Sequence, residues 1–455
     1  MPYNNENMQF SIPEEVSEII QKFEKAGFEI YIVGGAVRDL IMGRIVDDWD
    51  FTTNATPEQI LKLFPEGFYD NKFGTVGIES KKGYDPHEIT TFRTEIGYSD
   101  KRHPDKVVWG ETLEEDLGRR DFTINALALL LTQDFELIDL FGGQKDLENK
   151  LIRAVGNSVD RFSEDALRMM RAVRIATELG FVIEENTFEG IRQNSTLINQ
   201  IARERVADEL LKILASPYPY EGIVIFRNSG LMEQVLPEME KTFGVEQKSP
   251  GRHHIYDVGT HSLLSLKFCK STDPIVRLAT LIHDIGKPLT FKKLTNGTIT
   301  FYNHEIVGAR IAKVIANRLR FSNKDKDKLW RLVRYHQFTV DERQTDSALR
   351  RFLRKVSLEN IKDMLDLRVA DRLGGGARET SWRLEEFKKR LIEVQKQPFT
   401  AKDLRVGGHD VMKILGIPPG PKVGEVLEKL FEEVVEKKIE NNKDLLLKRL
   451  KEINI

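Results

Sequence analysis

The sequence predicts a chain that begins with an α+β or α/β region and continues as an almost entirely helical protein. Strand and helix patterns alternate up to about residue 145. Beyond residue 157, apolar residues recur at helical spacing over 158–180, 184–199, 204–215 and 219–229. The helical part has one expected interruption, a hairpin over 291–302 that turns at Asn296-Gly297 between β-rich flanks.

The composition is typical of a globular chain and shows no overall preference for a polyanion. The 69 basic and 71 acidic residues give a net charge of -2, so contacts with RNA must come from local patches. The single cysteine, Cys269, excludes an internal disulfide and a thiolate zinc cluster. The absence of an export signal and of an apolar run near 18 residues predicts a cytoplasmic protein without a membrane span. The apolar run Ala126–Leu131 is expected to belong to a buried helix.

A glycine-rich turn follows the first predicted strand, Glu29–Val33. Gly34 and Gly35 end this strand and open a helix, where backbone N–H groups can approach a phosphate closely and the helix N-terminus favours negative charge. Arg38 follows one turn later and can reach the same anion. Glycine pairs at such turns are common, so the pattern alone leaves phosphate binding as one of two interpretations.

Two aspartates follow within the next predicted strand, Asp48–Thr52. Asp48 and Asp50 would point to one face of that strand, about 7 Å apart, where their charges repel unless a cation lies between them. Magnesium binds carboxylate and phosphate oxygens together, and two-metal phosphoryl transfer needs a third carboxylate, for which Glu88 is the candidate. The alternative is that these are ordinary turn or edge-strand acids.

The order of motifs over about residues 28–215 resembles class II tRNA nucleotidyltransferases and bacterial poly(A) polymerases. These motifs are Gly-Gly-x-Val-Arg-Asp, Asp-x-Asp, Thr-Thr-Phe-Arg and the segment Arg119–Ala126. The resemblance implies an α+β head of the polymerase-β type with a small antiparallel sheet, not a Rossmann sheet. It also implies that Asp48 and Asp50 bind magnesium and that Arg38 and Arg120 contact the nucleotide. Arg120 and Asp121 would lie near the incoming ribose and triphosphate.

A second motif lies in the predicted helix 158–180. Glu164, Arg168 and Arg171 fall on its polar face, flanked by Asp165 and Arg174, as they would on an ordinary surface helix with ion pairs.

Base selection is the other interpretation of this motif. A carboxylate accepts hydrogen bonds and a guanidinium donates them, so Asp165 with Arg168 complements the amino group and ring nitrogen of adenine or cytosine. Guanine and uracil present the reverse order and would leave buried groups unpaired. The resembled family uses its Glu-Asp-x-x-Arg motif in this way, which implies that Glu164 and Asp165 bind nucleotide together with Arg168, Arg171 and Arg174.

The C-terminal half contains a set of candidate metal ligands. They occur in the order His, His-Asp, His, His, Asp: His261, His283, Asp284, His304, His336 and Asp371. Imidazole and carboxylate together suit divalent metals. The segment resembles HD-domain phosphohydrolases, with His261, His283, Asp284 and Asp371 as ligands of a first metal (manganese, nickel, cobalt or magnesium) and His304 and His336 available for a second. The alternative is a degenerate HD fold retained for RNA binding.

The leading hypothesis is template-independent addition of C, C and A to the 3′ end of tRNA from CTP and ATP, with magnesium as cofactor and the HD domain as an accessory for 3′-end repair. A close alternative is a poly(A) polymerase or a partial adding enzyme. Asn71–Val76 in place of a Gly-Arg-Arg-Phe-like element, and an intact loop Arg93–Asp116 with Tyr98, Asp100, Lys101 and Arg102, favour CCA addition. A hypothesis of another class makes the HD phosphohydrolase the main activity and the head an RNA-binding module.

Four domains are expected on this basis. They are a nucleotidyltransferase head (1–150), a helical neck with the selecting motif and an RNA-binding region (151–245), an HD-type metal domain (246–395) and a helical tail (396–455). The sequence leaves the oligomeric state open.

Overall fold

The computed structural model of the chain describes residues 10–70, 74–80, 86–96, 106–109, 112–131, 135–247, 256–341, 343–395, 401–436 and 438–453. These residues form two compact units: unit 1 contains Met1–Phe243 and Ile315–Phe321, and unit 2 contains Gly244–Val314 and Ser322–Ile455. The finer division into four domains stays a prediction. Residues 71–73 of the Asn71–Val76 element, and the loop residues Tyr98, Asp100, Lys101 and Arg102, lie outside the described residues.

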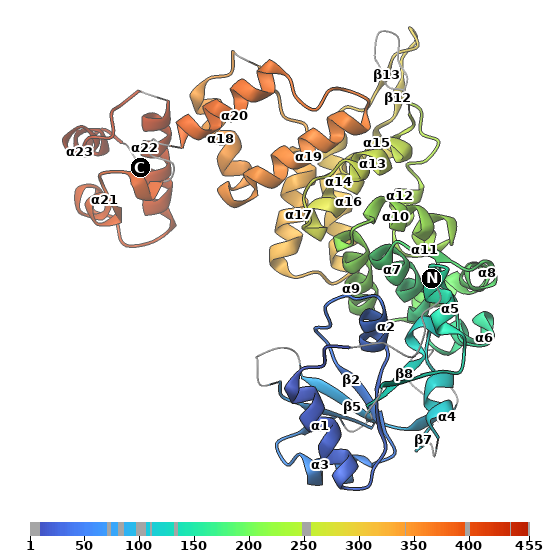
Figure 1. The fold of residues 1–455 in the computed structure, drawn as a ribbon. Helices are drawn as coiled ribbons and strands as arrows, with labels where there is room; N and C mark the ends of the chain where they lie inside the picture. Colours follow the sequence, from blue (N-terminus) through green and yellow to red (C-terminus); the bar gives the residue numbers. More distant parts are fainter. Residues whose placement is uncertain are drawn as a thin grey trace. The chain divides into compact units, whose positions relative to one another are not determined.

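Unit 1 contains a seven-stranded sheet in the order β3-β4-β5-β2-β1-β8-β9 (Figure 1). Its strands are β1 (Ile30–Val33), β2 (Asp50–Thr53), β3 (Phe68–Asp70), β4 (Thr75–Ile78), β5 (His87–Thr91), β8 (Leu127–Leu131) and β9 (Phe135–Asp139). The α+β polymerase head is confirmed. All neighbouring strands are antiparallel except β2 and β5, so the sheet is mixed and not wholly antiparallel as expected. The parallel pair is possible because a helix and two strands connect β2 to β5.

Two local predictions in this sheet are wrong. Ala126–Leu131 is not part of a helix, because Leu127–Leu131 forms β8 between β1 and β9. A short apolar run fits a buried strand as well as a buried helix, and periodicity cannot separate the two. Asp48 does not lie on β2, which begins at Asp50.

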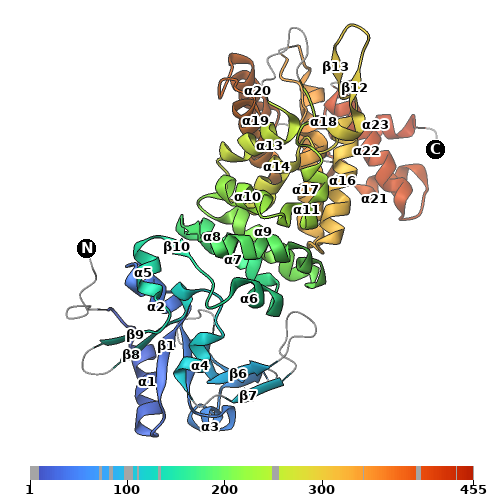
Figure 2. The same cartoon turned by 90° about the vertical axis from the view of Figure 1, so that its right-hand side faces the viewer.

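Short helices and a second pair of strands complete the α+β part of unit 1. The helices are α1 (Glu14–Lys25), α2 (Gly35–Ile41), α3 (Pro57–Leu63), α4 (Leu113–Gly118), η2 (Thr123–Asn125) and α5 (Gly143–Glu148). Figure 2 shows the antiparallel pair β6 (Arg93–Ile96) and β7 (Lys106–Trp109), which belongs to a sheet of its own. On α1, four apolar side chains at helical spacing are buried: Val16, Ile19, Ile20 and Phe23.

The rest of unit 1 is mostly helical, as the sequence predicts. Its elements are β10 (Leu151–Ile152), α6 (Ser158–Glu164), α7 (Leu167–Leu179), β11 (Val182–Ile183), α8 (Glu185–Asn194), η3 (Ser195–Gln200), α9 (Arg203–Ala215), α10 (Pro219–Asn228), α11 (Leu231–Val235) and α12 (Pro237–Glu240). The single helix expected over 158–180 is divided, because Asp165 is extended and its carboxylate accepts a hydrogen bond from the N–H of Leu167. A side chain that satisfies a free N–H in this way favours a helix start over a continuous helix.

Unit 2 is helical apart from one hairpin. Its elements are α13 (Val258–Lys267), α14 (Pro274–Ile282), α15 (Lys287–Thr290), β12 (Lys292–Lys293), β13 (Ile299–Thr300), α16 (His304–Arg318), α17 (Asn323–Tyr335), α18 (Asp346–Val356), η4 (Leu358–Asn360), α19 (Ile361–Gly374), α20 (Trp382–Val394), η5 (Ala401–Asp403), α21 (Gly408–Leu415), α22 (Pro421–Val435) and α23 (Lys443–Lys451). The last turn of α16, from Ile315, is counted with unit 1. The predicted hairpin is confirmed: β12 and β13 are antiparallel, and Gly297 adopts a φ of 78° between them. In the described part of the chain, no helix combines the length and apolar character needed to cross a membrane.

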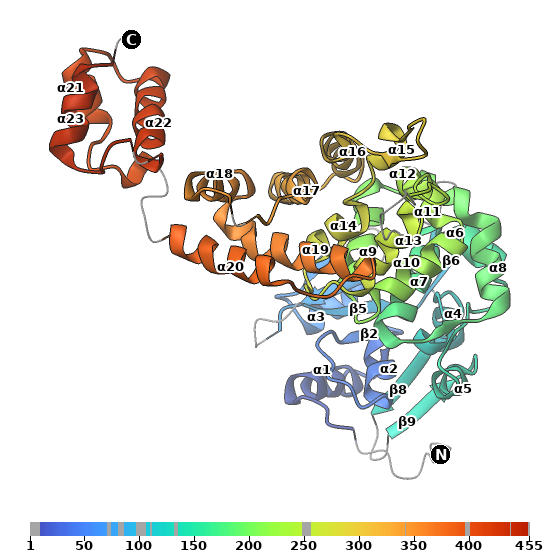
Figure 3. The same ribbon diagram turned by 90° about the horizontal axis from the view of Figure 1, so that it is seen from above.

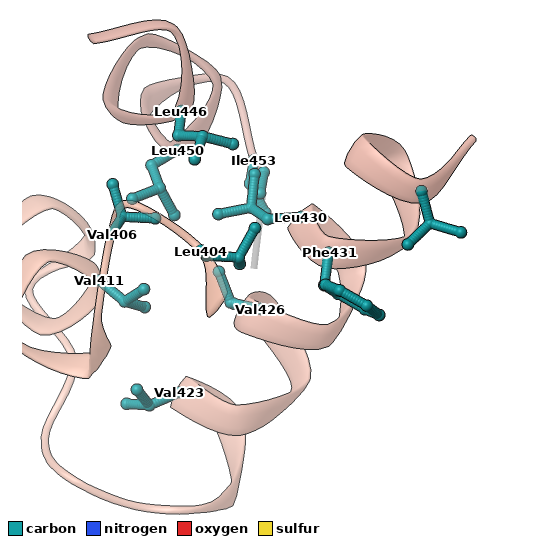
Figure 4. Close-up of a cluster of buried hydrophobic side chains, with 11 residues drawn as sticks. Leu404, Val406, Val411, Val423, Val426, Leu430, Phe431, Leu446, Leu450 and Ile453 are labelled. Carbon is teal, nitrogen blue, oxygen red and sulfur yellow. The ribbon is translucent and has the colours of Figure 1, made fainter. Parts of the chain in front are cut away.

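The last three helices enclose an apolar core (Figures 3 and 4). Its buried residues are Leu404, Val406, Val411, Val423, Val426, Leu430, Phe431, Val435, Leu446, Leu450 and Ile453. They recur at helical spacing in α22 and α23, which is why the apolar and charged residues of this segment alternate in the sequence.

Leu430→Ala is expected to loosen this core, because Leu430 is fully buried and the loss of such a side chain costs about 2–5 kcal/mol. Hydrogen exchange of the backbone amides of α22 should accelerate at least about 30-fold. Leu445→Ala is the matched control, because Leu445 is 42% exposed on α23. Equal exchange in the two variants would mean that the α21–α23 core does not hold these helices.

Candidate functional site

Three carboxylates meet at the start of β2. Asp50 is the first residue of this strand and lies opposite Glu88 in the parallel register of β2 and β5. Asp48 precedes the strand, yet its charge acts on Asp50. Burial, the charge of Asp48 and the weaker influence of Glu88 raise the pKa of Asp50 to about 6, although Arg120 opposes them. The structure therefore brings the predicted carboxylates together, in an environment that disfavours the negative charge of Asp50.

Gly34 allows the backbone to lie against this charged cluster. It precedes α2 with a φ of 72°, in the left-handed region that favours glycine. A Cβ atom at Gly34 would lie 3.0 Å from Nη1 of Arg120 and 3.5 Å from Oδ2 of Asp50. The predicted glycine turn and the paired aspartates, which are separate motifs in the sequence, therefore form one site with Arg120.

A chain of hydrogen bonds leads from this turn to α7. Nη1 of Arg38 donates to Oδ1 of Asn125 at 2.9 Å, and Nη2 of Arg38 pairs with Asp39 at 2.8 Å. Nδ2 of Asn125 donates to Oδ1 of Asp121 at 3.1 Å. The other oxygen of Asp121 accepts from Nε of Arg171 at 2.7 Å and contacts its Nη2 at 2.6 Å. Arg38 and Arg171 are thereby held in one network.

The pair of Asp121 and Arg171 remains charged across the physiological range. Burial alone would raise the pKa of Asp121, but Arg171 and the hydrogen bond from Asn125 lower it to about 2. Asp121 in turn raises the pKa of Arg171 above its ordinary value. Asp121 is buried whereas the side chain of Arg171 is 36% exposed, so the arginine keeps an open face beside the site.

Asp116 holds the two arginines that precede Asp121, and sequence reasoning did not identify this role. Its side chain is fully buried and pairs with Nη2 of Arg119 at 2.6 Å and with Nη2 of Arg120 at 3.1 Å. Burial would raise the pKa of Asp116, but the two arginines outweigh it and lower that pKa. The available signal was the spacing of three and four residues from Asp116 to two arginines at the C-terminal end of α4.

The predicted base-selecting residues are fixed by other groups. Arg168, which is 8% exposed, donates to Oε2 of Glu164 at 2.7 Å and to the carbonyl of Arg119 at 3.0 Å. Oδ1 of Asp165 accepts from the N–H of Leu167 at 3.0 Å, at the break between α6 and α7. The sequence pattern suggested that Glu164 and Arg168 interact along one helix. In the structure they interact across the break between two helices.

Arg174 lies in a different environment. It pairs with Glu209 of α9 at 2.7 Å and with Glu178 at 3.1 Å, and it is largely buried between them. The structure thus places Arg174 at the contact between α7 and α9. Its expected contact with nucleotide, like those of the other predicted residues, stays a prediction.

Unit 2 brings all six candidate metal ligands together from five helices or their ends. They form two adjacent groups: His261, His283 and Asp371 in one, and Asp284, His304 and His336 in the other. Five of the six side chains are buried, and Asp371 is half-buried. Residues separated by 110 positions in the sequence thus form one cluster, as the predicted order of ligands requires.

Asp284 belongs to the second group and also contacts the first. Its Oδ2 is 3.2 Å from Nε2 of His283, and its Oδ1 is 3.3 Å from Nε2 of His304. On one side His261 lies 3.1 Å from Oδ1 of Asp371, and on the other the Nε2 atoms of His304 and His336 are 3.3 Å apart. Asp284 therefore offers one carboxylate oxygen to each group of candidate ligands.

Hydrogen bonds orient three of these imidazoles with Nε2 toward the centre. Nδ1 of His283 lies 2.8 Å from the carbonyl of Thr280, and His304 and His336 make equivalent contacts of 2.8 and 2.7 Å with carbonyls three residues earlier. A carbonyl partner requires a proton on Nδ1 and leaves Nε2 as the ligand atom. Burial would lower the pKa of His283, but Asp284 and Asp371 raise it to about 10. The two carboxylates thus favour positive charge at His283, whereas burial lowers the pKa of His336.

Gly286, in the His-Asp-Ile-Gly-Lys motif, permits this assembly. A Cβ atom there would lie 2.1 Å from the carbonyl oxygen of His304 and 2.6 Å from the backbone nitrogen of Gly308. Only glycine allows α16 to approach so closely, and this approach carries His304 to Asp284.

The cluster opens into a cavity of about 500 Å³. Two cationic side chains that sequence reasoning did not assign to a site line it, Lys287 and Arg368. Nζ of Lys287 contacts Oδ2 of Asp284 and Oε1 of Gln247, each at 2.5 Å, and Nη1 of Arg368 pairs with Oδ2 of Asp371 at 3.2 Å. The arrangement suits an anionic substrate, such as a phosphate ester, beside the candidate metal ligands.

Asp50→Asn is expected to stabilise the metal-free protein at neutral pH. The pKa of Asp50 in the folded chain, about 6, lies above the ordinary value of 3.8 that it takes in the unfolded chain, so the stabilising contribution of the protonated form is lost as pH rises through 6. In EDTA, the variant should melt at a higher temperature than the wild type at pH 7.5, and this difference should shrink toward pH 4. Asp47→Asn, on the exposed neighbour of Asp48, should show no such pH dependence. A difference independent of pH would contradict this electrostatic origin.

Comparison with protein-family models matches three segments of the chain. Residues 30–153 match the poly A polymerase head domain, and residues 180–243 match the probable RNA and SrmB-binding site of polymerase A. Residues 298–450 match the putative tRNA nucleotidyltransferase domain 2.

Curated relatives and solved structures match over nearly the full length. The CCA-adding enzyme of Limosilactobacillus reuteri is 36% identical over 451 residues, which are 97% of each chain, and that of Geobacillus kaustophilus is 33% identical over 443 residues, again 97% of each. The crystal structure of the Bacillus stearothermophilus CCA-adding enzyme in complex with CTP matches 96% of this chain and 95% of its own, with a TM-score of 0.68 and 28% identity. The Thermotoga maritima CCA-adding enzyme complexed with tRNA shares the fold, with a TM-score of 0.58. The chain therefore belongs to the family of CCA-adding enzymes.

Proposed function

We propose that this chain adds C, C and A to the 3′ end of tRNA from CTP and ATP without a nucleic-acid template. The observation that carries the proposal is the carboxylate cluster of Asp48, Asp50 and Glu88 beside Arg120, in a chain that aligns with CCA-adding enzymes over 97% of its length. We propose that this activity takes place in the cytoplasm, the compartment that the sequence predicts.

A nucleotidyltransferase of this family uses a divalent metal. We infer that the metal is Mg²⁺ and that Asp48 and Asp50 hold it. Burial raises the pKa of Asp50, so a small, hard cation beside the two carboxylates would stabilise their negative charge. Held by Asp48 and Asp50, such a metal would supply Lewis acidity for activation of the RNA 3′-hydroxyl and for departure of the pyrophosphate. Glu88, on the adjoining strand, is the third carboxylate of the site.

The remaining residues of the head position the nucleotide. Arg120 lies against Gly34 and Asp50 and is oriented by Asp116, so its guanidinium can bind the triphosphate of the incoming nucleotide. A Cβ atom at position 35 would lie 3.5 Å from Nη2 of Arg38. The backbone of the glycine turn and this guanidinium can therefore contact the same anion.

Base selection is assigned to Asp165 and Arg168. Asp165 would accept a hydrogen bond from the amino group of cytosine or adenine, and Arg168 would donate to the adjacent ring nitrogen. Both side chains are held before a nucleotide binds: Arg168 by Glu164 and a carbonyl, and Asp165 by a backbone N–H. Rigid partners of fixed polarity discriminate against uracil and guanine, because rotation of the side chains cannot satisfy the reversed pattern.

A poly(A) polymerase or a partial adding enzyme remains the alternative closest in chemistry. The family model that matches residues 30–153 is that of the poly A polymerase head domain. The relatives that match over nearly the full length are CCA-adding enzymes. The full-length similarity favours CCA addition over both alternatives.

A second activity, phosphoester hydrolysis, is supported by the cluster around Asp284. Six candidate ligands in two groups, with oriented imidazoles, suit one of the divalent metals expected from the sequence: manganese, nickel, cobalt or magnesium. The adjoining cavity is lined by Lys287 and Arg368, which suit an anionic substrate. His261, His283, Asp284 and Asp371 would hold such a metal, which would supply Lewis acidity toward a phosphate and toward an attacking water. We propose that this site removes a cyclic or terminal phosphate from damaged 3′ ends. The carboxylates near Arg120 argue against the hypothesis that hydrolysis is the main activity and the head only binds RNA.

Asp48→Ala and Asp50→Ala should each reduce nucleotide addition to less than a tenth of the wild-type rate, because loss of a metal ligand costs several kcal/mol of transition-state stabilisation. Addition of labelled CMP to tRNA that lacks its 3′ end measures the rate. Asp47→Ala removes a neighbouring exposed carboxylate and serves as the control, with a rate near that of the wild type. A variant of Asp48 or Asp50 that retains more than a tenth of the rate would contradict metal catalysis at this pair.

Asp165→Ala and Arg168→Ala should relax base discrimination. Incorporation of UMP or GMP relative to CMP and AMP should rise about tenfold or more, because the partners that reject these bases are lost. Competition assays with mixed nucleotides measure the ratio, and Asp160→Ala, on the exposed side of α6, is the control. A slower enzyme with unchanged preference would leave the motif with a structural role only.

Asp284→Ala should abolish phosphoester hydrolysis and spare nucleotide addition, whereas Asp48→Ala should do the opposite, because the two sites use different ligands. Hydrolysis of bis(p-nitrophenyl) phosphate is measured with magnesium, manganese, nickel and cobalt in turn. A wild-type protein without hydrolysis in any metal, and without bound metal by elemental analysis, would refute the second activity.

A further inference from the structure

Asp116, in the last turn of α4, is a fully buried carboxylate beside the proposed transferase site. Its Oδ1 accepts from Nε of Arg119 at 3.0 Å and from Nη2 of the same arginine at 2.6 Å. Its Oδ2 accepts from Nη2 of Arg120 at 3.1 Å. The two oxygens are thus divided between the two arginines, and Oδ2 holds Arg120 by one nitrogen of its guanidinium.

Arg120 also borders Asp50, one of the proposed metal ligands. A Cβ atom at Gly34 would lie 3.0 Å from Nη1 of Arg120 and 3.5 Å from Oδ2 of Asp50, so both side chains reach the same side of the turn. The charge of Arg120 lowers the pKa of Asp50, against the larger effects of burial and of Asp48. Among the described residues, however, the ion pair of Arg120 is with Asp116, and none joins it to Asp50. Arg120 therefore acts on Asp50 without occupying its oxygens.

Asp50 is a carboxylate that a nearby cation would stabilise. Burial and the charge of Asp48 disfavour its ionised form, so either a divalent metal or the guanidinium of Arg120 would be favourable beside it. The two cations exclude each other, because a guanidinium that pairs with a carboxylate binds the oxygens that a metal needs as ligands. An arginine able to pair with Asp50 would therefore compete with the metal.

The contacts of Arg120 restrain it and still leave it able to bind a ligand. Its backbone N–H donates to the carbonyl of Leu117 at 3.2 Å, and the carbonyl of Arg119 accepts from Nη2 of Arg168 at 3.0 Å, so the backbone is held on both sides of the peptide bond. Nε of Arg120 is buried and has no hydrogen-bond partner among the described residues. The side chain is thus held at Nη2, while Nε and Nη1 remain for a ligand.

We propose that Asp116 is a positioning residue that holds Arg120 away from Asp50 and so keeps the oxygens of Asp50 available to a divalent metal. The inference rests on the proposed metal site of Asp48 and Asp50, and it adds the group that keeps a competing cation away. Loss of the Asp116 charge would release Arg120 to pair with Asp50, and more metal would be needed to fill the site. A carboxylate that only stabilised the end of α4 would affect the melting temperature and not the metal requirement.

Iron-mediated cleavage of the full-length protein measures occupancy of the metal site without nucleotide and without catalysis. Iron(II) takes the place of magnesium, and with ascorbate and hydrogen peroxide it cuts the backbone close to the bound metal, where mass spectrometry locates the cuts. For cuts in peptides that contain Gly34 or Asp50, the iron concentration at half-maximal cleavage should rise at least about fivefold in Asp116→Asn, which is within the range of coupling between neighbouring side chains. In an Arg120→Ala background, Asp116→Asn should have no such effect, because the competing cation is gone.

Asp146→Asn is the matched control. Asp146 is a buried carboxylate of the same unit that pairs with Arg153 at 3.0 Å, and it has no part in the proposed site. Its replacement should lower the melting temperature and leave the iron requirement unchanged. An equal rise in the iron requirement of both variants would overturn the proposal, because loss of any buried ion pair would then have the same effect.

The magnesium dependence of CMP addition gives a second measurement. In Asp116→Asn, the magnesium concentration at half-maximal rate should rise by a similar factor, and excess magnesium should restore most of the lost rate. A lower rate that magnesium does not restore would overturn the proposal. If Asp116→Asn alone does not fold, Asp116→Asn/Arg120→Ala should fold, because the released charge causes the defect, and a double variant that also fails to fold would overturn the proposal.

The iron experiment also separates this inference from the metal site on which it rests. Wild-type protein without cuts near Asp50 would refute the proposed metal site and the role of Asp116 with it. Cuts near Asp50 with the same iron dependence in the wild type and in Asp116→Asn would refute the role of Asp116 and leave the metal site standing.

Discussion

The candidate transferase site depends on the ion pair between Asp121 and Arg171. Asp121 is buried, and a buried carboxylate is stable only if its charge is matched and its oxygens accept hydrogen bonds. Arg171 supplies the matching charge. Asn125 donates a hydrogen bond to the other oxygen of Asp121 and accepts one from Arg38. The turn that we propose binds phosphate and the helix that carries Arg168, the proposed base-selecting residue, are thereby held together. Selection without a template requires this rigidity, since a movable arginine could adapt to the wrong base.

The candidate metal cluster of unit 2 follows the same rule with different groups. Asp284 is buried among imidazoles and Lys287, and each partner is oriented by a second contact, such as the carbonyl of Thr280 for His283. Close packing makes this possible, because Gly286 has no side chain to separate α16 from the motif. In both sites, charged side chains are stabilised by one another, so that the ligand meets groups already in place.

The sequence predicts the site residues well where a motif is local, and less well where partners come from afar. Asp48, Asp50 and Glu88 were predicted to meet because carboxylates beside a glycine turn suggest a metal, and the structure brings them together. The apolar periodicity continues through Asp165 and so does not predict that the helix is divided there. The division depends on a single hydrogen bond between the Asp165 side chain and the backbone. The roles of Asn125, Asp116 and Arg368 follow from packing between elements and have no strong local pattern. Ala126–Leu131 was misassigned because pairing with β1 and β9, and not local propensity, makes a strand of it.

The most direct test of the transferase assignment is the sequence of the product. The purified protein is incubated with tRNA that lacks its 3′ end and with each labelled nucleotide in turn, then with all four together, and the products are sequenced. CTP alone should give two added C residues, CTP with ATP should give CCA and then stop, and UTP or GTP should add nothing. Runs of A from ATP alone would show a poly(A) polymerase. Addition that ends after CC with ATP present, or no addition from CTP, would equally contradict CCA synthesis by Asp48, Asp50 and the pair Asp165 and Arg168.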